Sequence, residues 1–389
     1  MSDVEKSVLD VYKRVNPSIY HIESDEKEFK ARNEFMKNLF LKRLCFPPKM
    51  FSKSTLLEFG SGTGENSLFY LKWGATCTFV EMNDDACTRA KTIFSAFGIS
   101  PTAYSIQNKS LFDFNSDVNF DIVTSNGVIH HTDKKEKAFD IHAKHVRPGG
   151  FLVMGIGTAA GAFQRNLQKA IIYQFAKDEN EIISLAERLF SDHLDRAERF
   201  GGRNRTAIIY DSYVNPKMDV PTISEIMRWF SMNGLELYSS WPPMTPALLG
   251  DSVSMQPAEY GSILGLPQMI WASHNEDDIT HLKKINRGMY EFVGCVEELT
   301  TSMNDIVPDK ETDLRGINEN INRALAQKPP NPYPMYISKF HRCILEAREI
   351  VEHLRNDDLE GTEKCIRKSK EIFHGTAGLG MNWFVGYKE

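Results

Sequence analysis

The chain has 389 residues, of which 41% are hydrophobic and 25% charged, and its formal net charge is −6 at pH 7. This length supports one large domain with a sizeable core or two domains, and the composition is that of an ordinary soluble globular protein. The negative charge gives no global attraction for nucleic acid or an anionic membrane, which makes a nucleic-acid-binding protein less favoured without excluding it.

We expect no targeting segment, membrane span or disulfide framework. The opening stretch MSDVEKSVLDVYKRVN lacks an apolar core of signal-peptide length, and no apolar run approaches the roughly 18 residues of a membrane span. Six cysteines are scattered without a CxxC pair, which argues against disulfide staples and against a zinc knuckle. These features favour a cytoplasmic protein.

Residues 1–50 are predicted to form one or two helices. In EFKARNEFMKNLFLKRL, one face recurs at spacings of three and four residues: Phe29, Asn33, Met36, Phe40 and Leu44. That spacing is typical of an amphipathic helix. The prolines of CFPPKM, Pro47 and Pro48, end the helical pattern.

From residue 55 short apolar runs alternate with helical segments. The expected strands are TLLEF (55–59), TCTFV (76–80), AYSI (103–106), FDIVTS (120–125) and FLVMGI (151–156). Continuous apolar runs, rather than alternating patterns, indicate a parallel sheet that helices cover on both faces.

Beyond residue 157 the pattern becomes mainly helical. Residues 160–200 are followed by the arginine-rich turn RAERFGGRNR, the helix TISEIMRWFSMNG and the strand LELYSS. A second helical block spans about 280–373, and GMNWFVGYK at the end is predicted to be a strand. A strand after a helical block indicates that the block is an insertion and that the chain returns to its first sheet.

A glycine loop follows the first strand in LLEFGSGTGENS, with Gly60, Gly62 and Gly64 at alternate positions. Glycines there allow the backbone to approach a ligand at the positive end of a helix, although dinucleotide folds use such a loop as well. Two carboxylates near the loop add information about the ligand. Glu58 lies inside the first strand, and Glu81 ends the second strand, where it can accept hydrogen bonds from both hydroxyls of a ribose.

With these motifs, the stretch from about 55 to 156 resembles the class I S-adenosylmethionine-dependent methyltransferases. LLEFGSGTGENS corresponds to that family's first motif, FVEMND to its second-strand motif, FDIVTSNGVIHHT to its fourth-strand motif and HVRPGGFLVMG to the turn into its fifth strand. The resemblance implies an α/β fold, with a seven-stranded Rossmann-like sheet whose last strand is antiparallel and lies beside the fifth. A helical N-terminal segment and large helical cap insertions would complete the fold.

The resemblance divides the chain into four segments. They are an N-terminal helical lid (1–50), an S-adenosylmethionine-binding core (51–241) with a cap at about 157–221, a helical cap or dimerisation region (242–378), and a final core strand (379–389). An apolar stripe in the third segment is interpreted as a packing face, with a homodimer interface as the alternative: Ile285, Met289, Phe292, Val296, Leu299 and Met303.

The resemblance also implies residues that hold the cofactor, S-adenosyl-L-methionine. The backbone from Gly60 through Ser61 and Gly62 to Gly64 lies against its methionine part, Glu58 helps to hold its amino group and Glu81 takes its ribose hydroxyls. Met82 packs on the adenine, and Asn126 and Gly127 line the pocket beneath the sulfonium. The family often has an acidic residue after the third strand for the adenine amino group. Here IQNKSLFDF offers Asn108, or Ser110 with the backbone, instead.

Histidines suggest two kinds of chemistry. His130 and His131 follow the fourth strand, where ligands bind in open α/β sheets, and either is a candidate to orient the cofactor or to remove a proton from the acceptor. The alternative is a loop histidine that only shapes the pocket. His142 and His145 have a spacing that suits a metal, but no carboxylate or cysteine completes a site, so we expect packing side chains and no metal.

Substrate-binding candidates lie between residues 196 and 213. Arginines crowd this stretch, and Arg203 and Arg205 either clamp a carboxylate or phosphate of the substrate or belong to a solvated helix end. Tyr210, Asp211 and Tyr213 belong to YDSYVNP, which is similar to a segment over the active site of some bacterial small-molecule methyltransferases. In the N-terminal helices, Tyr20 and Arg32 either close over the cofactor's carboxylate or are structural.

These observations predict a methyltransferase of the EC 2.1.1 class that methylates an O, N or C atom of a small molecule or metabolite enclosed by helical caps. Catalysis would rest mainly on proximity and alignment, because the donor is already activated. One alternative is an RNA or protein methyltransferase. The acidic charge and the lack of an RNA-binding motif argue against RNA as the substrate. Another is a non-catalytic interaction scaffold, which has no need of the glycine loop and Glu81.

Overall fold

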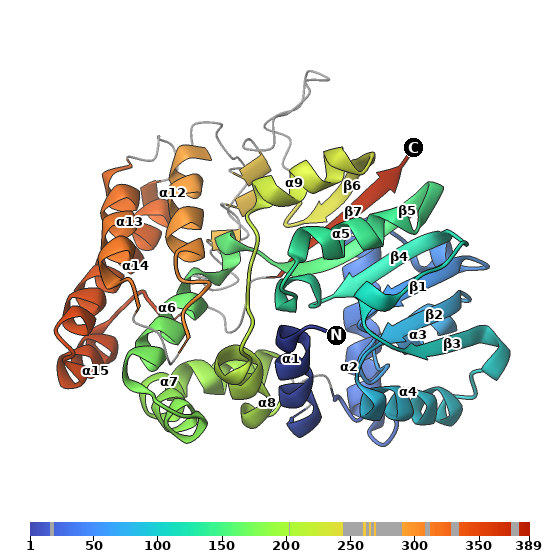
Figure 1. Cartoon of the computed structure of the whole chain (residues 1–389), viewed down its shortest axis with the longest axis horizontal. Helices are drawn as coiled ribbons and strands as arrows, with labels where there is room; N and C mark the ends of the chain where they lie inside the picture. Colours follow the sequence, from blue (N-terminus) through green and yellow to red (C-terminus); the bar gives the residue numbers. More distant parts are fainter. Residues whose placement is uncertain are drawn as a thin grey trace. The chain divides into compact units, whose positions relative to one another are not determined.

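The computed structural model (Figure 1) describes residues 1–15, 19–201, 203–243, 260–261, 264–265, 268–269, 290–307, 312–327, 334–374 and 381–389. The chain divides into two compact units. The first comprises Met1–Ile156, Arg228–Pro243 and Asn382–Glu389, and the second comprises Gly157–Met227 and Met244–Met381. The chain therefore leaves the first unit and returns to it twice.

A seven-stranded sheet of order β3-β2-β1-β4-β5-β7-β6 forms the first unit. The strands are β1 (Thr55–Phe59), β2 (Thr76–Glu81), β3 (Tyr104–Asn108), β4 (Phe120–Asn126), β5 (Val146–Gly157), β6 (Leu235–Trp241) and β7 (Met381–Lys388). The first five are parallel, whereas β7 runs antiparallel to β6. The predicted sheet, with its last strand beside the fifth, is confirmed.

Helices cover both faces of this sheet. One face packs against α2 (Glu26–Lys37), its π-helical continuation η1 (Asn38–Arg43), α3 (Ser67–Lys72) and α4 (Asp84–Ala96). On the other face lies α5 (Lys135–Lys144), where Phe139 packs on Trp229 and Phe230 of α9 (Ile223–Met232). The two-sided cover explains why the strands are apolar along their length rather than alternating.

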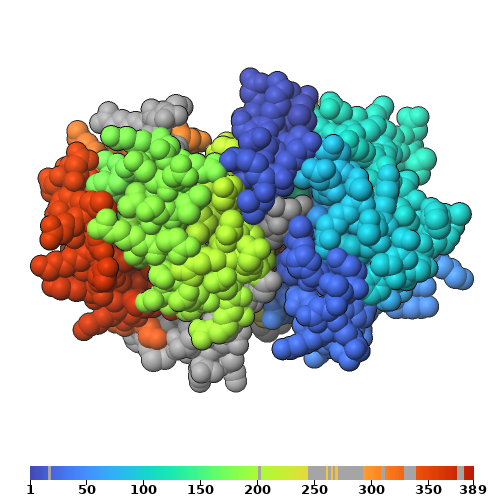
Figure 2. All heavy atoms as spheres, turned by 90° about the horizontal axis from the view of Figure 1, so that it is seen from below, coloured from blue at the N-terminus to red at the C-terminus, as the bar shows by residue number. Residues whose placement is uncertain are grey.

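The chain begins with α1 (Asp3–Arg14), which is specified locally by a capping box. Ser2 Oγ accepts a hydrogen bond from the backbone N of Glu5 at 3.2 Å, and the Glu5 carboxylate accepts one from the backbone N of Ser2 at 2.6 Å. Acidic residues in the first turn and basic residues in the last complement the helix dipole. In the space-filling view α1 is dark blue and stands at the surface (Figure 2).

The second unit is helical in its described residues. Its elements are α6 (Ala159–Phe175), α7 (Glu179–Gly201), α8 (Arg205–Ile209), the π-helical turn η6 (Tyr210–Val214), α12 (Tyr290–Thr301), α13 (Leu314–Ala326), α14 (Pro334–Arg355) and α15 (Leu359–Lys368). α6 contacts α7, η6, α12 and α14, and every residue from Ala159 to Tyr173 is buried. α6 is therefore the central helix of this unit.

The apolar stripe predicted at 285–303 is partly described. Ile285 and Met289 lie outside the described residues, whereas its other members are buried: Phe292, Val296, Leu299 and Met303. α12, which carries most of them, packs against α6 and α13. This part of the stripe is thus a packing face within the chain. No helix in the described ranges is both long and apolar enough to cross a bilayer.

Candidate functional site

The glycine loop connects β1 to α3 and is shaped by its contact with the end of β4. Gly60 has φ +67°, a conformation that side chains rarely adopt, and a Cβ atom added to it would lie 2.4 Å from Val128 Cγ2. The backbone N of Gly60 donates to the carbonyl of Val80 at 2.8 Å. Glycine is therefore required at this position by packing as well as by conformation.

Glu81 is the last residue of β2, and its carboxylate is held by the backbone of two loops. One oxygen accepts a hydrogen bond from the backbone N of Gly62 and the other from the backbone N of Asn83, both at 2.8 Å. Burial raises the pKa of Glu81, and these backbone hydrogen bonds oppose the rise. A carboxylate oriented in this way keeps lone pairs that can accept hydrogen bonds from ligand hydroxyls.

Glu58 lies in β1, below the loop, and is almost fully buried. The hydroxyl of Ser67, at the start of α3, donates to it at 2.5 Å. Burial raises the pKa of Glu58 to about 7, the Ser67 hydrogen bond opposes the rise, and repulsion from Glu81 adds to it. A cation placed beside this carboxyl group would lower its pKa and keep it ionised.

The end of β4 brings the predicted catalytic pair to the same edge of the sheet. Asn126 ends the strand, and Gly127 follows with φ +73° and no described atom within 4 Å of a Cβ atom added there. His130 and His131 are both buried in the short helix η5 (Ile129–His131), with ring centroids 4.4 Å apart. Tyr12 of α1 contacts His131 edge-on at 6.1 Å.

The two candidates for the adenine contact are both engaged within the chain. The Asn108 amide donates to the carbonyl of Glu81 at 3.0 Å. The Ser110 hydroxyl donates to the carboxylate of Glu5 in α1 and accepts from the backbone N of Phe112 at 3.1 Å. The structure therefore places the carboxylate of Glu5 beside Ser110, just after β3.

Sequence reasoning missed the contact of Glu5 with Ser110. The pattern Ser-Asp-Val-Glu at residues 2–5 is a capping-box signal, which predicts where a helix starts. It carries no information on the partner of that helix, and Ser110 lies 105 residues further along the chain. A contact over that separation is set by tertiary packing alone.

One ion pair and one hydrogen bond connect the N-terminal helices to residues near the loop. Lys13 of α1 pairs with Asp84 of α4 at 2.6 Å. Arg32 of α2 donates from Nε to the Asn66 side chain at 2.7 Å, and its guanidinium lies 4.1 Å from the ring centroid of Tyr20. The predicted pair Tyr20 and Arg32 is thus brought together, next to the residue that precedes α3.

His142 and His145 pack inside the first unit. Their Nδ1 atoms donate to the carbonyls of Ala138 and Ile141 at 2.6 and 2.7 Å. The ring of His142 lies 4.5 Å from that of Phe59, and burial lowers its pKa to about 4. Among the described residues there is no group of three His, Cys, Asp or Glu side chains that would hold a metal ion.

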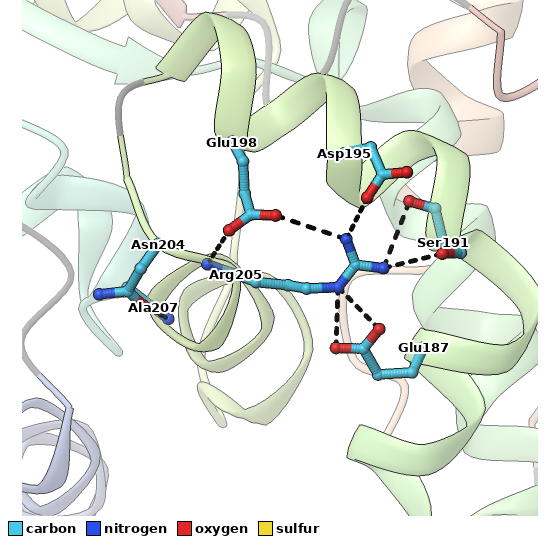
Figure 3. A network of polar contacts seen from close by, with 7 residues as sticks. All are labelled: Glu187, Ser191, Asp195, Glu198, Asn204, Arg205 and Ala207. Atoms are coloured by element: carbon cyan, nitrogen blue, oxygen red, sulfur yellow. Dashed lines mark hydrogen bonds and ion pairs between the residues drawn. The ribbon is translucent and has the colours of Figure 1, made fainter.

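The predicted substrate residues all lie in the second unit, and Arg205 is enclosed by acceptors (Figure 3). Its guanidinium contacts Glu187 at 2.7 Å, Asp195 at 2.5 Å and Glu198 at 3.5 Å, all three on α7. It also donates to the hydroxyl of Ser191 at 2.9 Å. These contacts join α8 to α7, which favours a structural role for Arg205.

The other substrate candidates lie along η6 and beside it. Arg203 pairs with Asp211 at 3.1 Å. Tyr213 is buried and donates its hydroxyl to the side chain of Gln168 in α6 at 3.0 Å, whereas Tyr210 donates to Glu179 in α7 at 2.6 Å. Arg203 is therefore paired with Asp211, Asp211 and Tyr213 contact α6, and Tyr210 and Arg205 bond to α7.

Residues 57–152, from β1 into β5, match the family model of a methyltransferase domain. Together with the strand order, the match shows that this part of the chain is a methyltransferase domain of the class I, S-adenosylmethionine-dependent kind. The resemblance inferred from the sequence is confirmed, and S-adenosylmethionine is the methyl donor of such domains.

Several solved structures are similar to the chain at low identity. The N-methyltransferase NodS from Bradyrhizobium japonicum WM9, in complex with S-adenosyl-L-homocysteine, is 18% identical with a TM-score of 0.31, over 41% of this chain and 76% of that one. PKMT2 from Rickettsia typhi in complex with AdoHcy is 14% identical with a TM-score of 0.42, over 59% and 47%. The YcgJ protein from Bacillus subtilis is 17% identical with a TM-score of 0.32, over 55% and 72%. These values are too low to indicate an activity or substrate, and no curated protein sequence matches the chain significantly.

Proposed function

We propose that the chain is a cytoplasmic S-adenosylmethionine-dependent methyltransferase that methylates an O, N or C atom of a small molecule or metabolite. The observation that carries this proposal is the pair of buried carboxylates, Glu58 and Glu81, beneath the glycine loop. Burying a carboxylate is costly unless its charge is compensated, and a ligand with an ammonium group and a ribose would compensate Glu58 and add hydrogen bonds to Glu81.

The residues of the first unit fit the cofactor part by part. Glu58 would hold its ammonium group, Glu81 its ribose hydroxyls, and the backbone of residues 60–64, with Ser61 in it, its methionine part. Met82 is half-buried just after β2, next to Glu81, in a position to pack on the adenine. The open space in front of Gly127 allows a ligand to approach the backbone beside Asn126. The cofactor supplies the activated methyl group, and the chain aligns the acceptor.

Glu5 would accept a hydrogen bond from the adenine amino group, and Ser110 would position the Glu5 carboxylate. The Asn108 NH2 donates to the carbonyl of Glu81, and its amide oxygen is a neutral acceptor, weaker than a carboxylate. A carboxylate accepts hydrogen bonds only, which suits an exocyclic amine. For an acceptor with a hydroxyl group, His130 or His131 would remove the proton, because both lie at the end of β4.

The test is calorimetric titration of S-adenosylmethionine and S-adenosylhomocysteine into wild type, Glu81→Ala and the control Glu236→Ala, an exposed carboxylate on β6. We expect micromolar binding that Glu81→Ala loses and Glu236→Ala keeps. Absence of binding by the wild type would favour the scaffold alternative.

Labelling assays then identify the acceptor class. Extract is separated into small molecules, RNA and protein, and each fraction receives labelled cofactor and enzyme. Label in the small-molecule fraction supports the proposal, and label confined to RNA or protein contradicts it. Light scattering tests the homodimer suggested by the sequence.

A further inference from the structure

The central helix of the second unit buries cationic side chains. Gln168 and Lys169 of α6 come three and four residues after Arg165, so both lie next to Arg165 on the helix surface. The exposed fractions of Arg165, Gln168 and Lys169 are 7%, 0% and 4%. Arginine and lysine are almost never this deeply buried unless acidic groups or ligands pair with them.

Among the described residues, Arg165 and Arg203 share one carboxylate, and Arg165 also donates to the hydroxyl of Ser212. The guanidinium of Arg165 lies 3.5 Å from the carboxylate of Asp211, but the same carboxylate oxygen is 3.1 Å from Arg203. The ammonium group of Lys169 donates to the backbone carbonyl of Asn215 over 3.4 Å, a long contact to a neutral acceptor. One carboxylate is thus shared by two guanidinium groups.

Burial and nearby positive charges lower the pKa values of two groups in this region. Burial, Arg165 and Lys217 all lower the pKa of Lys169, to about 8. Burial, Arg196 and Arg165 lower the pKa of His193, to about 3, so the imidazole stays neutral. Both shifts have the direction expected where cations lie close together in a medium of low polarity.

Hydrogen-bond donors are also left over here. The hydroxyl of Tyr213 fixes the Gln168 amide by donating to its oxygen, and within the described part of the chain the amide nitrogen has no partner. Within the same residues Nε of Arg165 has no partner either, nor has Nδ1 of His193, which donates or accepts according to the tautomer. Buried donors without acceptors are uncommon in folded proteins and call for a specific explanation.

We propose that this part of the α6 surface binds a compact oxyanion, a carboxylate or phosphate group, through Arg165, Gln168 and Lys169. A guanidinium fork, an ammonium group and an amide NH2 together offer the donors that such an anion accepts. The proposal rests on the proposed function only in that the anion is taken to be part of the methyl acceptor, which would then be an acidic metabolite.

The test uses the full-length protein and simple probes. Sodium phosphate, sodium succinate and neutral succinamide are titrated by calorimetry at constant ionic strength with chloride as the background anion. Wild type is compared with Lys169→Met and with Arg188→Gln, which removes an exposed cation of α7 that pairs with Glu363. Gln168→Glu, which places a carboxylate of the chain itself on the same part of α6, is followed by thermal unfolding in chloride.

We expect saturable binding of phosphate or succinate by the wild type and Arg188→Gln, with at least about tenfold weaker binding by Lys169→Met. Which probe binds identifies the anion, and succinamide binds to none of the proteins. Gln168→Glu raises the melting temperature in chloride, which keeps the proposal testable if Lys169→Met does not fold. Equal binding by Lys169→Met, no saturable binding of either anion, or a lower melting temperature for Gln168→Glu overturns it.

S-adenosylhomocysteine titrated into the same samples separates the two proposals. Binding of the cofactor product without binding of either anion refutes the anion site and leaves the proposed function standing. Binding of an anion without binding of S-adenosylhomocysteine supports the anion site and refutes the proposed function.

Discussion

The hydroxyl of Ser110, just after β3, donates a hydrogen bond to the carboxylate of Glu5 in α1, and both residues are buried. This bond, with the ion pair between Lys13 and Asp84, holds the first helix of the chain against the carboxyl edge of the sheet. The same edge carries the glycine loop, Glu81 and the two histidines. The N-terminal helix is therefore part of the candidate cofactor site rather than an appendage.

Glu5→Ala should weaken binding of S-adenosylhomocysteine about tenfold, because one charge-assisted hydrogen bond to the adenine amino group is lost. The analogue with hypoxanthine in place of adenine provides the decisive comparison, since it lacks this amino group. Wild type should prefer the adenine compound, and Glu5→Ala should lose the preference. Asp3→Ala removes an exposed carboxylate of the same helix and should keep it. Equal discrimination by wild type and Glu5→Ala would refute the role of Glu5.

Glu58→Gln should change how stability depends on pH. Because the pKa of Glu58 is raised to about 7, the folded protein binds more protons than the unfolded chain between the ordinary pKa and about 7. The contribution of this group to stability therefore falls as pH rises through that window. Without cofactor, the variant should be more stable than wild type at pH 8, by about 1–3 kcal/mol, and should differ little at pH 4.

Urea unfolding of the wild type and Glu58→Gln at several pH values checks this expectation, with Glu236→Gln as an exposed control on β6. The variant should also bind S-adenosylmethionine more weakly, since it offers no charge to the ammonium group. Parallel pH curves for wild type and variant would show that Glu58 ionises as an ordinary carboxyl group.

Gly60→Ala and Gly127→Ala form a matched pair in the same edge of the sheet. Both positions have positive φ, but only at Gly60 does an added Cβ atom collide, with Val128. We expect Gly60→Ala to cost about 2–4 kcal/mol of unfolding free energy and Gly127→Ala only about 1 kcal/mol. Val128→Ala added to Gly60→Ala should recover part of the loss, as measured by urea unfolding.

The effect of Gly127→Ala on cofactor affinity should be larger than its small effect on stability suggests. If a ligand approaches the backbone at Gly127, the small side chain of Gly127→Ala lowers the affinity for S-adenosylhomocysteine by tenfold or more while the fold is kept. Unchanged affinity would mean that Gly127 does not line the pocket.

Arg205→Ala should affect stability without affecting cofactor binding. Removing the guanidinium leaves Glu187, Asp195 and Glu198 near each other without their shared cation, and their repulsion adds to the lost hydrogen bonds. Because these groups are partly exposed, the expected cost is about 1–2 kcal/mol. Arg315→Ala, which removes an exposed single ion pair on α13, should cost less than about 0.5 kcal/mol. If the two variants have equal stability and Arg205→Ala alone loses methyl transfer, Arg205 binds substrate after all.

The parts of the fold that sequence patterns predicted are those with local signals. The five parallel strands follow from apolar runs between helices, and the places of β6 and β7 follow from motif resemblance. Residues in the β1–α3 loop and at the end of β2 were identified in the same way, through spacing along the chain.

The parts that were not predicted depend on contacts between distant segments. Glu5 meets Ser110 only when α1 lies on the sheet, and no local pattern specifies that. In α6, Arg165 and Lys169 are of residue types usually found at the surface, yet both are buried. Arg165 donates to Ser212 of η6, and Lys169 donates to the carbonyl of Asn215, just after η6. The enclosure of Arg205 by three acids of α7 likewise follows from how two helices meet, not from either sequence alone.

The position of β7 has a consequence for synthesis of the protein. In the described sheet β6 pairs with β7 alone, and β7 comes at the end of the chain, after the second unit. While the ribosome is making residues 244–381, β7 does not yet exist, so β6 has no strand with which to pair. The edge of the sheet beside β5 therefore stays unpaired during that time. Strand pairing on that side therefore comes last, and a chain cut before Met381 should lose the docking of β6 as well as β7.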